Sequence, residues 1–154
     1  MAFSLSRKSE QELVGVRDQL VKVVQRAITI TPVEFTVLQG LRTKEEQAAN
    51  VASGASWTMD SRHLTGHAVD LGALLNGKVS WHWSLYYPIA HAMQVSARAL
   101  DVEIRWGGVW DRTLNSLGDD LEDEVIQYGN RRRSEGKPIR IDGPHFELTK
   151  SRYP

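Results

Sequence analysis

Apolar residues near the start of the chain recur at helical spacing. Most lie three or four positions apart, as on one buried helix face, at Leu13, Val16, Leu20, Val23, Val24 and Ala27. Ser9 and Glu12 precede them in an S-x-x-E pattern, which is typical of a helix start. The pattern therefore predicts a helix over residues 9–27.

Strand and helix patterns alternate in the next part of the chain. Residues 34–40 are apolar and β-branched, which predicts a strand. Thr43 and Glu46 repeat the S/T-x-x-E pattern, which predicts a second helix that ends near residue 52. A polar loop over 53–61 then leads to an alternating segment, residues 67–74, which predicts a second strand.

The second half of the chain continues this alternation. An aromatic connection precedes Pro88, which suits the first turn of a helix that reaches about Leu100. Residues 102–108 and 143–148 have strand patterns, and between them we expect one polar helix within residues 109–137. This order of elements predicts an α+β fold with a small, mainly antiparallel sheet and helices packed on it.

Composition and charge fit one globular domain over residues 1–154. The chain is 41% hydrophobic, which suffices for a single core at this length. Nineteen basic and nineteen acidic residues cancel, so the chain lacks the basic surface that nucleic acids require. No apolar run approaches the roughly 18 residues of a membrane span. We expect no nucleic-acid partner and no membrane insertion.

The stretch SRHLTGHAVDL, residues 61–71, concentrates candidate metal ligands. The chain contains no cysteine, so a metal would need nitrogen and oxygen ligands, and a catalytic zinc takes three of them. The intervening glycine disfavours a helix that would pair His63 with His67, and on a strand His67 and Asp70 point to opposite faces. His63 and Asp70 are a plausible pair, with His145 as the third ligand. A polar surface loop is the alternative.

The same residues form a two-part motif. S-x-H-x(2)-G-x-A-x-D and, far downstream, [DE]-x-x-H occur at Ser61, His63, Gly66, Ala68, Asp70, Asp142 and His145. This pair of motifs resembles the zinc D-Ala-D-Ala carboxypeptidase and dipeptidase family, whose wider group includes lysostaphin-type peptidases and the hedgehog domain. Residues 31–47 and 104–111 are similar to its L-alanyl-D-glutamate endopeptidase branch, which is common among bacteriophage endolysins.

The resemblance assigns roles to several residues. It implies one Zn²⁺ per chain with His63, Asp70 and His145 as ligands. It also implies that Asp142 is the catalytic acid/base and that Arg42 steadies the developing oxyanion. Glu147 shares the strand face of His145, so it is the alternative base, or it binds substrate or supports a ligand. A surface arginine near a helix start is the alternative for Arg42.

Other polar and aromatic residues have less specific interpretations. No G-x-S-x-G motif surrounds Ser61, and we expect its hydroxyl to orient the loop or to bind substrate. We expect three histidines to be structural or exposed, namely His67, His82 and His91. Three tryptophans could line a groove for a peptide stem or sugar, with core packing as the alternative, namely Trp81, Trp83 and Trp110.

The resemblance implies a zinc-dependent peptidoglycan endopeptidase that cleaves the L-alanyl-D-glutamate bond and lyses the host cell. A D,D-carboxypeptidase is the alternative enzyme, and a non-catalytic zinc-containing binding domain is the alternative from another class. We expect one catalytic domain without a separate wall-binding domain. The N-terminus lacks a signal peptide, so we expect a monomer made in the host cytoplasm, released by a holin, that acts on the cell wall in the periplasm.

Overall fold

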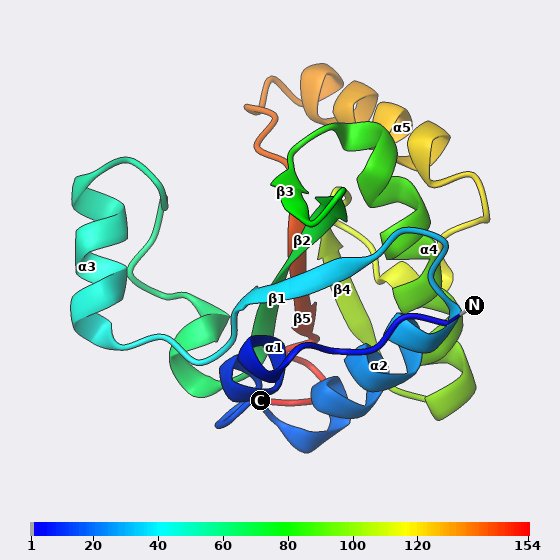
Figure 1. Cartoon of the computed structure of the whole chain (residues 1–154). Helices are drawn as coiled ribbons and strands as arrows, with labels where there is room; N and C mark the ends of the chain where they lie inside the picture. The colour runs from blue at the N-terminus through cyan, green and yellow to red at the C-terminus, as the bar shows by residue number, and fades with distance from the viewer. Residues whose placement is uncertain (1) are drawn as a thin grey trace.

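A five-stranded antiparallel sheet forms the centre of the computed structural model, which describes residues 2–154 (Figure 1). The strand order is β1-β2-β5-β4, and a short β3 pairs with β2. The strands are β1 (Phe35–Gln39), β2 (Ala68–Leu75), β3 (Lys78–Ser80), β4 (Ile104–Gly107) and β5 (Asp142–Leu148). The expected α+β fold with a small antiparallel sheet is therefore confirmed.

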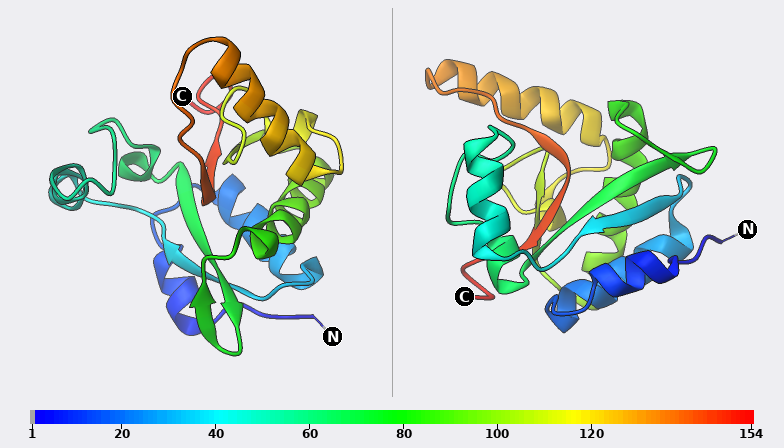
Figure 2. Two further views of the ribbon diagram at one scale, coloured as in Figure 1. Left: turned by 90° about the horizontal axis from the view of Figure 1, so that it is seen from above. Right: turned by 60° about the vertical axis from the view of Figure 1, so that its left-hand side comes forward.

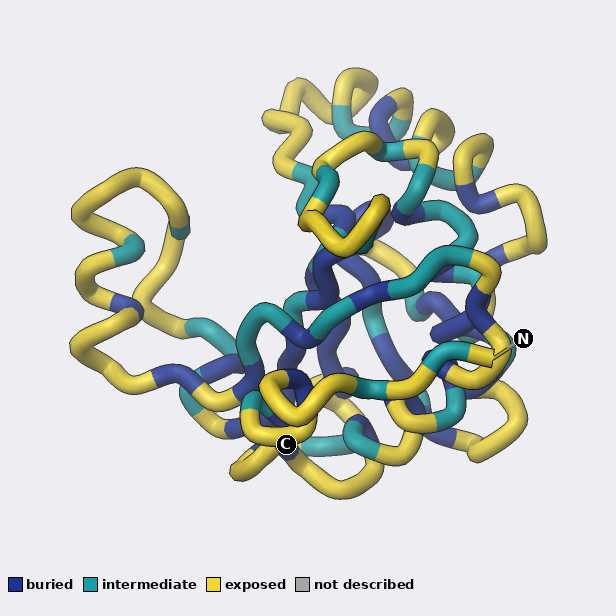
Figure 3. The backbone as a smooth tube through the Cα atoms, viewed as in Figure 1, coloured by how far each residue is buried: buried dark blue, intermediate teal, exposed yellow. Residues whose placement is uncertain are grey.

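Helices cover one face of this sheet, and one helix lies apart from it (Figures 1 and 2). The helices are α1 (Arg7–Glu12), α2 (Asp18–Ile30), α3 (Lys44–Ala52), α4 (Trp83–Leu100) and α5 (Leu121–Ser134), with 3₁₀ turns η1 (Arg62–Thr65) and η2 (Leu114–Ser116). Helix α2 packs against α4, and α5 contacts the outer side of α4. Helix α3 and the loop after it form an arm that is mostly exposed (Figure 3).

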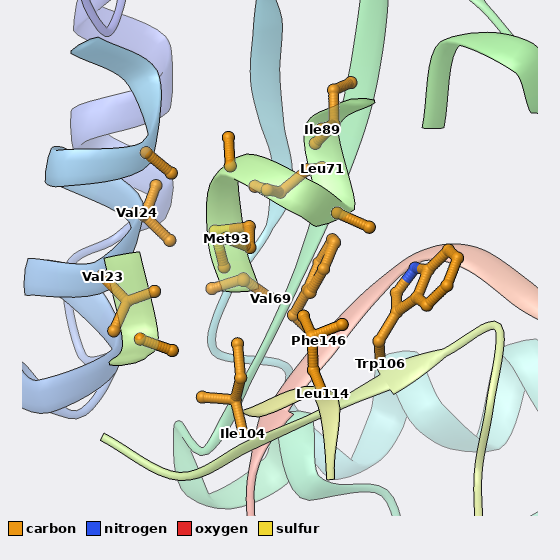
Figure 4. Close-up of a cluster of buried hydrophobic side chains, with 14 of the residues drawn as sticks. Val23, Val24, Val69, Leu71, Ile89, Met93, Ile104, Trp106, Leu114 and Phe146 are labelled. Atoms are coloured by element: carbon orange, nitrogen blue, oxygen red, sulfur yellow. The ribbon is translucent and has the colours of Figure 1, made fainter. Parts of the chain in front are cut away.

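Strand alternation separates an apolar face of the sheet from a polar one. Val69 pairs with Phe146, and Phe146 with Trp106, across three strands, and these side chains point toward α2 and α4 (Figure 4). All three are fully buried. Because successive residues of a strand face opposite sides, their neighbours on the same strands face the other side, where the polar site forms.

The N-terminal helix is shorter than its pattern predicts. The expected single helix over residues 9–27 is wrong, because the chain turns at Gly15 with a φ of +89°, which interrupts a right-handed helix. The S-x-x-E interpretation of Ser9 is wrong too. Ser6 caps α1, and the Ser9 hydroxyl instead accepts a hydrogen bond from the Val37 amide of β1 (2.9 Å).

The central helix begins earlier than expected. Pro88 lies inside α4 rather than in its first turn, so the helix loses one backbone hydrogen bond there. Tyr86 precedes the proline and is buried against the core. Its hydroxyl accepts from the Ala73 amide (3.1 Å) and donates to the Ser80 carbonyl (2.8 Å), which fastens the β2–β3 hairpin to α4. These contacts stabilise the helix across the proline.

Two other expectations about helices are confirmed. Thr43 and Glu46 make the predicted capping box at the start of α3. The polar excursion contains α5, which has acidic residues in its first turn and arginines in its last, as the helix dipole favours. Among residues 2–154, no helix is long and apolar enough to cross a membrane.

Candidate metal centre

The polar face of the sheet places two of the expected ligands side by side. Asp70 on β2 pairs directly with His145 on β5, and one pleat further along Glu147 pairs with Ala68. Arg105 on β4 pairs with Glu147 from the other side. Four polar side chains from three strands therefore share one face, because the register of β5 is fixed by Phe146 and Leu148 in the core on the opposite face.

The third expected ligand comes from the turn before β2. Ser61 caps η1 by accepting a hydrogen bond from the His63 amide (3.2 Å). Gly66 ends η1 with a φ of +74°, a conformation that glycine adopts without strain. This tight turn brings His63 back over the start of β2, and the expectation that Ser61 orients the loop is in keeping with that hydrogen bond.

The three candidate ligands converge on one point. The Asp70 Oδ1 atom lies 3.3 Å from His63 Nε2 and 3.2 Å from His145 Nδ1. One ligand atom of each residue lies within 4.8 Å of the others. His67 is buried but outside this group, with Nδ1 2.7 Å from the Thr65 hydroxyl. The structure thus brings together the trio predicted from the sequence.

Each imidazole has its outward nitrogen fixed by a hydrogen bond. His63 Nδ1 donates to the Gly40 carbonyl (2.8 Å), and His145 Nε2 donates to the Glu147 carboxylate (2.8 Å). Partners of this kind orient metal-binding histidines and set the ring nitrogen that faces the metal. The other two ring nitrogens both face Asp70: His145 Nδ1 is hydrogen-bonded to Oδ1 (3.2 Å), and His63 Nε2 lies 3.3 Å from the same oxygen.

The group could hold a metal ion. His63 Nε2 is buried and has no hydrogen-bond partner within residues 2–154, although it lies close to Asp70. A buried polar atom without a partner is costly, and a metal ion would satisfy it. Two imidazole nitrogens and one carboxylate oxygen also match the three protein ligands of many catalytic zinc sites. The residues present fit such an ion.

The charges in the group are strongly coupled. Burial acts to raise the pKa of Asp70, but the hydrogen bond with His145 and the close approach of His63 hold it well below its ordinary value. Burial acts to lower the pKa of His145, but the Asp70 and Glu147 carboxylates raise it to about 10. The site thus favours positive charge between two carboxylates, which is also the charge that a metal cation supplies.

Arg42 is buried rather than on the surface, so the surface interpretation of this residue is wrong. Its Nε and Nη2 atoms donate to the Gln39 side chain (3.0 and 2.7 Å), and Nη1 donates to Gln47 (2.6 Å). Nη2 also lies 3.5 Å from Asp70 Oδ2. Gln47 is fully buried and bonds to Ser56 and Thr58, a connection that the sequence pattern does not reveal.

Two carboxylates accompany the ligands. Burial and the nearby charge of Asp70 raise the pKa of Asp142, which lines the same cleft. Glu147 is buried, and one of its oxygens is engaged by His145. Glu147 thus holds the His145 ring, whereas Asp142 lines the cleft beside the trio.

A cleft of about 380 Å³ opens over the trio, a size that suits small ligands. Trp110 and Trp57 line it. The Trp110 ring lies 5.2 Å from the His145 ring, and Arg140 packs over the Trp57 ring at 5.4 Å. Trp57 is a cleft residue that the sequence patterns do not single out, because its position depends on how the arm after α3 folds back.

The other aromatic and histidine expectations have mixed outcomes. Trp81 and Trp83 do not line this cleft, so the groove interpretation is wrong for these two. Trp81 is exposed on the β3 side, and Trp83 packs against Tyr87 and Trp106. His82 is exposed, and His91 is half-buried next to Gln94, as expected of residues outside the site.

Comparison with known proteins agrees with this geometry. Residues 1–149 match the model of a family described as phage L-alanyl-D-glutamate peptidase. The chain belongs to this family. Membership makes the chain a peptidase, so the alternative of a non-catalytic binding domain is excluded.

Two of three relatives in the family cover nearly the whole chain, and the third covers half of it. The L-alanyl-D-glutamate peptidase of Escherichia phage T5 is 33% identical over 96% of this chain and 99% of its own. That of Listeria phage A118 is 40% identical over 51% of this chain and 27% of its own. The crystal structure of the Serratia marcescens L-Ala D-Glu endopeptidase ChiX aligns with a TM-score of 0.74 and 38% identity, over 96% of this chain and 91% of that one.

Proposed function

We propose that this chain is a zinc-dependent endopeptidase that cleaves the L-alanyl-D-glutamate bond in the peptide stem of peptidoglycan. The peptidase names of its relatives support the bond and the substrate class. The observation that carries the metal dependence is the trio His63, Asp70 and His145 at the floor of the cleft, with a partnerless buried nitrogen aimed into it. Zinc is the metal that this ligand set most often binds in hydrolytic sites.

The chain's own residues supply positioning and proton transfer. A zinc ion bound by the trio supplies Lewis acidity and lowers the pKa of water from 15.7 toward ~7. Burial and the charge of Asp70 raise the pKa of Asp142. Asp142 takes the proton of the attacking water and returns it to the leaving amine. Arg42, held by Gln39 and Gln47, contributes positive charge near Asp70 and the developing oxyanion.

The D,D-carboxypeptidase alternative lacks support from the comparisons, which name an L-alanyl-D-glutamate bond in the T5, A118 and Serratia proteins alike. We propose further that the chain acts as an endolysin. In this role the catalytic domain is a monomer that is made in the host cytoplasm and passes through a holin to the wall.

Metal analysis combined with digestion of purified peptidoglycan tests the proposal. Wild type should contain one zinc per chain and should release fragments with new amino termini on D-glutamate, and a chelator should abolish this until zinc is restored. His63→Ala should lose both zinc and activity. Asp142→Asn should keep zinc and lose activity by about 10² or more. Full activity in chelator, or release of D-alanine alone, would refute the proposal.

His67→Ala is the matched control for the ligand assignment. His67 is as buried as His63 and lies four residues away, but it contacts Thr65 instead of Asp70. The variant should retain zinc and cleavage. Loss of zinc from this variant, with its fold intact by circular dichroism, would overturn the assignment of His63 over His67.

A further inference from the structure

Arg105 is a cleft residue whose guanidinium has no hydrogen-bond acceptor within residues 2–154. It lies on β4, lines the same cleft as the trio, and its Nε atom is buried. No hydrogen bond or ion pair within residues 2–154 involves its side-chain nitrogens. A partly buried guanidinium without an acceptor is unfavourable, so an acceptor from outside the chain would stabilise it.

The other two arginines of the cleft are already engaged. All three nitrogens of the Arg42 guanidinium donate to Gln39 or Gln47. Arg62 donates through Nη2 to the carbonyls of Leu148 and Tyr153, near the C-terminus, although its Nε is also buried without a partner within residues 2–154. Lys150 also lines the cleft, but it is largely exposed and lies 4.0 Å from Asp60 at the rim. Arg105 is thus the partly buried arginine of the cleft whose guanidinium nitrogens all lack an acceptor within residues 2–154.

The sheet register places Arg105 at a useful distance from the trio. Arg105 pairs with Glu147 across β4 and β5, and His145 lies two residues from Glu147 on the same face. Diagonal neighbours of this kind have α-carbons about 7–8 Å apart. An arginine side chain spans much of that distance, so its fork can meet a group of the substrate next to the bond held over His145.

The proposed substrate carries a matching group. Glutamate has two carboxyl groups, and only one can continue a peptide chain, so the other remains free as a carboxylate close to the scissile nitrogen. Within residues 2–154, no protein carboxylate makes a hydrogen bond or ion pair with Arg105. One oxygen of Glu147 is engaged by His145, and Asp70 is surrounded by the two histidines and Arg42. A planar guanidinium binds such a carboxylate through two parallel hydrogen bonds.

We propose that Arg105 binds the free carboxylate of the glutamyl residue and thereby makes the enzyme specific for an alanyl-glutamate bond. The inference rests on the proposed function and adds the group that recognises the leaving side of the substrate. It also explains why a basic residue, Arg105, lies on the same sheet face as Glu147 and His145. Arg105 positions the substrate and has no part in the proton transfers of Asp142.

Two synthetic peptides test this assignment in the intact protein with zinc bound. One contains the L-Ala-D-Glu bond with the glutamyl carboxyl free, and the other carries an amide at that carboxyl. Wild type should cleave the amide with a kcat/KM about 10- to 100-fold lower. Arg105→Gln should lose a similar factor on the carboxylate peptide and little on the amide. Arg105→Lys should recover part of the loss, since it keeps the charge without the fork.

Arg133→Gln is the matched control, because Arg133 is an exposed arginine of α5 that contacts Asn130 outside the cleft. It should behave as wild type on both peptides, and zinc content should be equal in all variants. Equal losses on both peptides in Arg105→Gln, or no preference of wild type for the carboxylate, would overturn the role of Arg105 alone. A wild type that cleaves neither peptide would overturn the proposed function itself.

Discussion

Substitution of Glu147 by glutamine separates two roles for this residue, ligand support and general base. One Glu147 oxygen accepts from His145 Nε2 at 2.8 Å, and both side chains are about nine-tenths buried. A hydrogen bond to a charged group contributes about 1.5–3 kcal/mol, whereas a neutral one contributes about 0.5–1.5 kcal/mol. The amide oxygen of glutamine can still accept, so the variant loses about 1.4 kcal/mol, which is about tenfold in zinc affinity.

Competition with a chromophoric chelator measures this affinity, and peptide cleavage at saturating zinc measures the remaining catalysis. We expect Glu147→Gln to bind zinc about tenfold more weakly and to keep a near wild-type kcat once zinc is saturating. Asp142→Asn should give the opposite result, with unchanged affinity and a low kcat. Unchanged affinity combined with a loss of about 10² or more in kcat for Glu147→Gln would identify Glu147 as the base.

Three further substitutions, two at glycines and one at an ion pair, test the stability of the fold. Gly66→Ala should destabilise the protein by about 2–4 kcal/mol in urea unfolding, because strain at positive φ adds to a Cβ only 2.3 Å from a backbone oxygen. Gly54→Ala, also at positive φ but with free space, should cost at most about 1–2 kcal/mol. Asp111→Asn, which loses the paired hydrogen bonds of Arg131, should cost less than about 1 kcal/mol at pH 7 in the same assay.

The pH dependence of the Asp111 effect has a defined sign. The hydrogen bond from Arg131 lowers the pKa of Asp111 below its ordinary value. The pair therefore contributes its full stability above the unfolded pKa of about 3.9 and loses it as the pH falls through the lower folded pKa. A difference between wild type and variant that grows on acidification would contradict this reasoning. Equal costs of Gly54→Ala and Gly66→Ala would contradict the close contact assigned to Gly66.

Local patterns predict much of the site because its determinants are local. The glycine between His63 and His67 ends a turn, and strand alternation decides which neighbours of Asp70 share its face. The same alternation puts Glu147 beside His145, which the structure has as a hydrogen bond. These features depend on spacing within a few residues, so they can be predicted from the local sequence.

Features that depend on strand register or on distant loops are not predictable in this way. The position of Arg105 beside Glu147 requires the pairing of β4 with β5, whose segments are separated by the whole α5 excursion. Gln47 is buried only because the loop after α3 returns to it. The helix break at Gly15 is hidden too, since apolar spacing continues across it while the backbone turns.

The division of the site between two parts of the chain has a consequence for how it forms. The outward nitrogen of His63 is held by Gly40, at the end of β1, whereas that of His145 is held by Glu147 on its own strand. Asp70 on β2 pairs with both strands, with Gln39 on one side and His145 on the other. A change that loosens β1 therefore misorients His63 and spares the His145–Glu147 pair, so His63 is the proposed ligand whose geometry depends on β1.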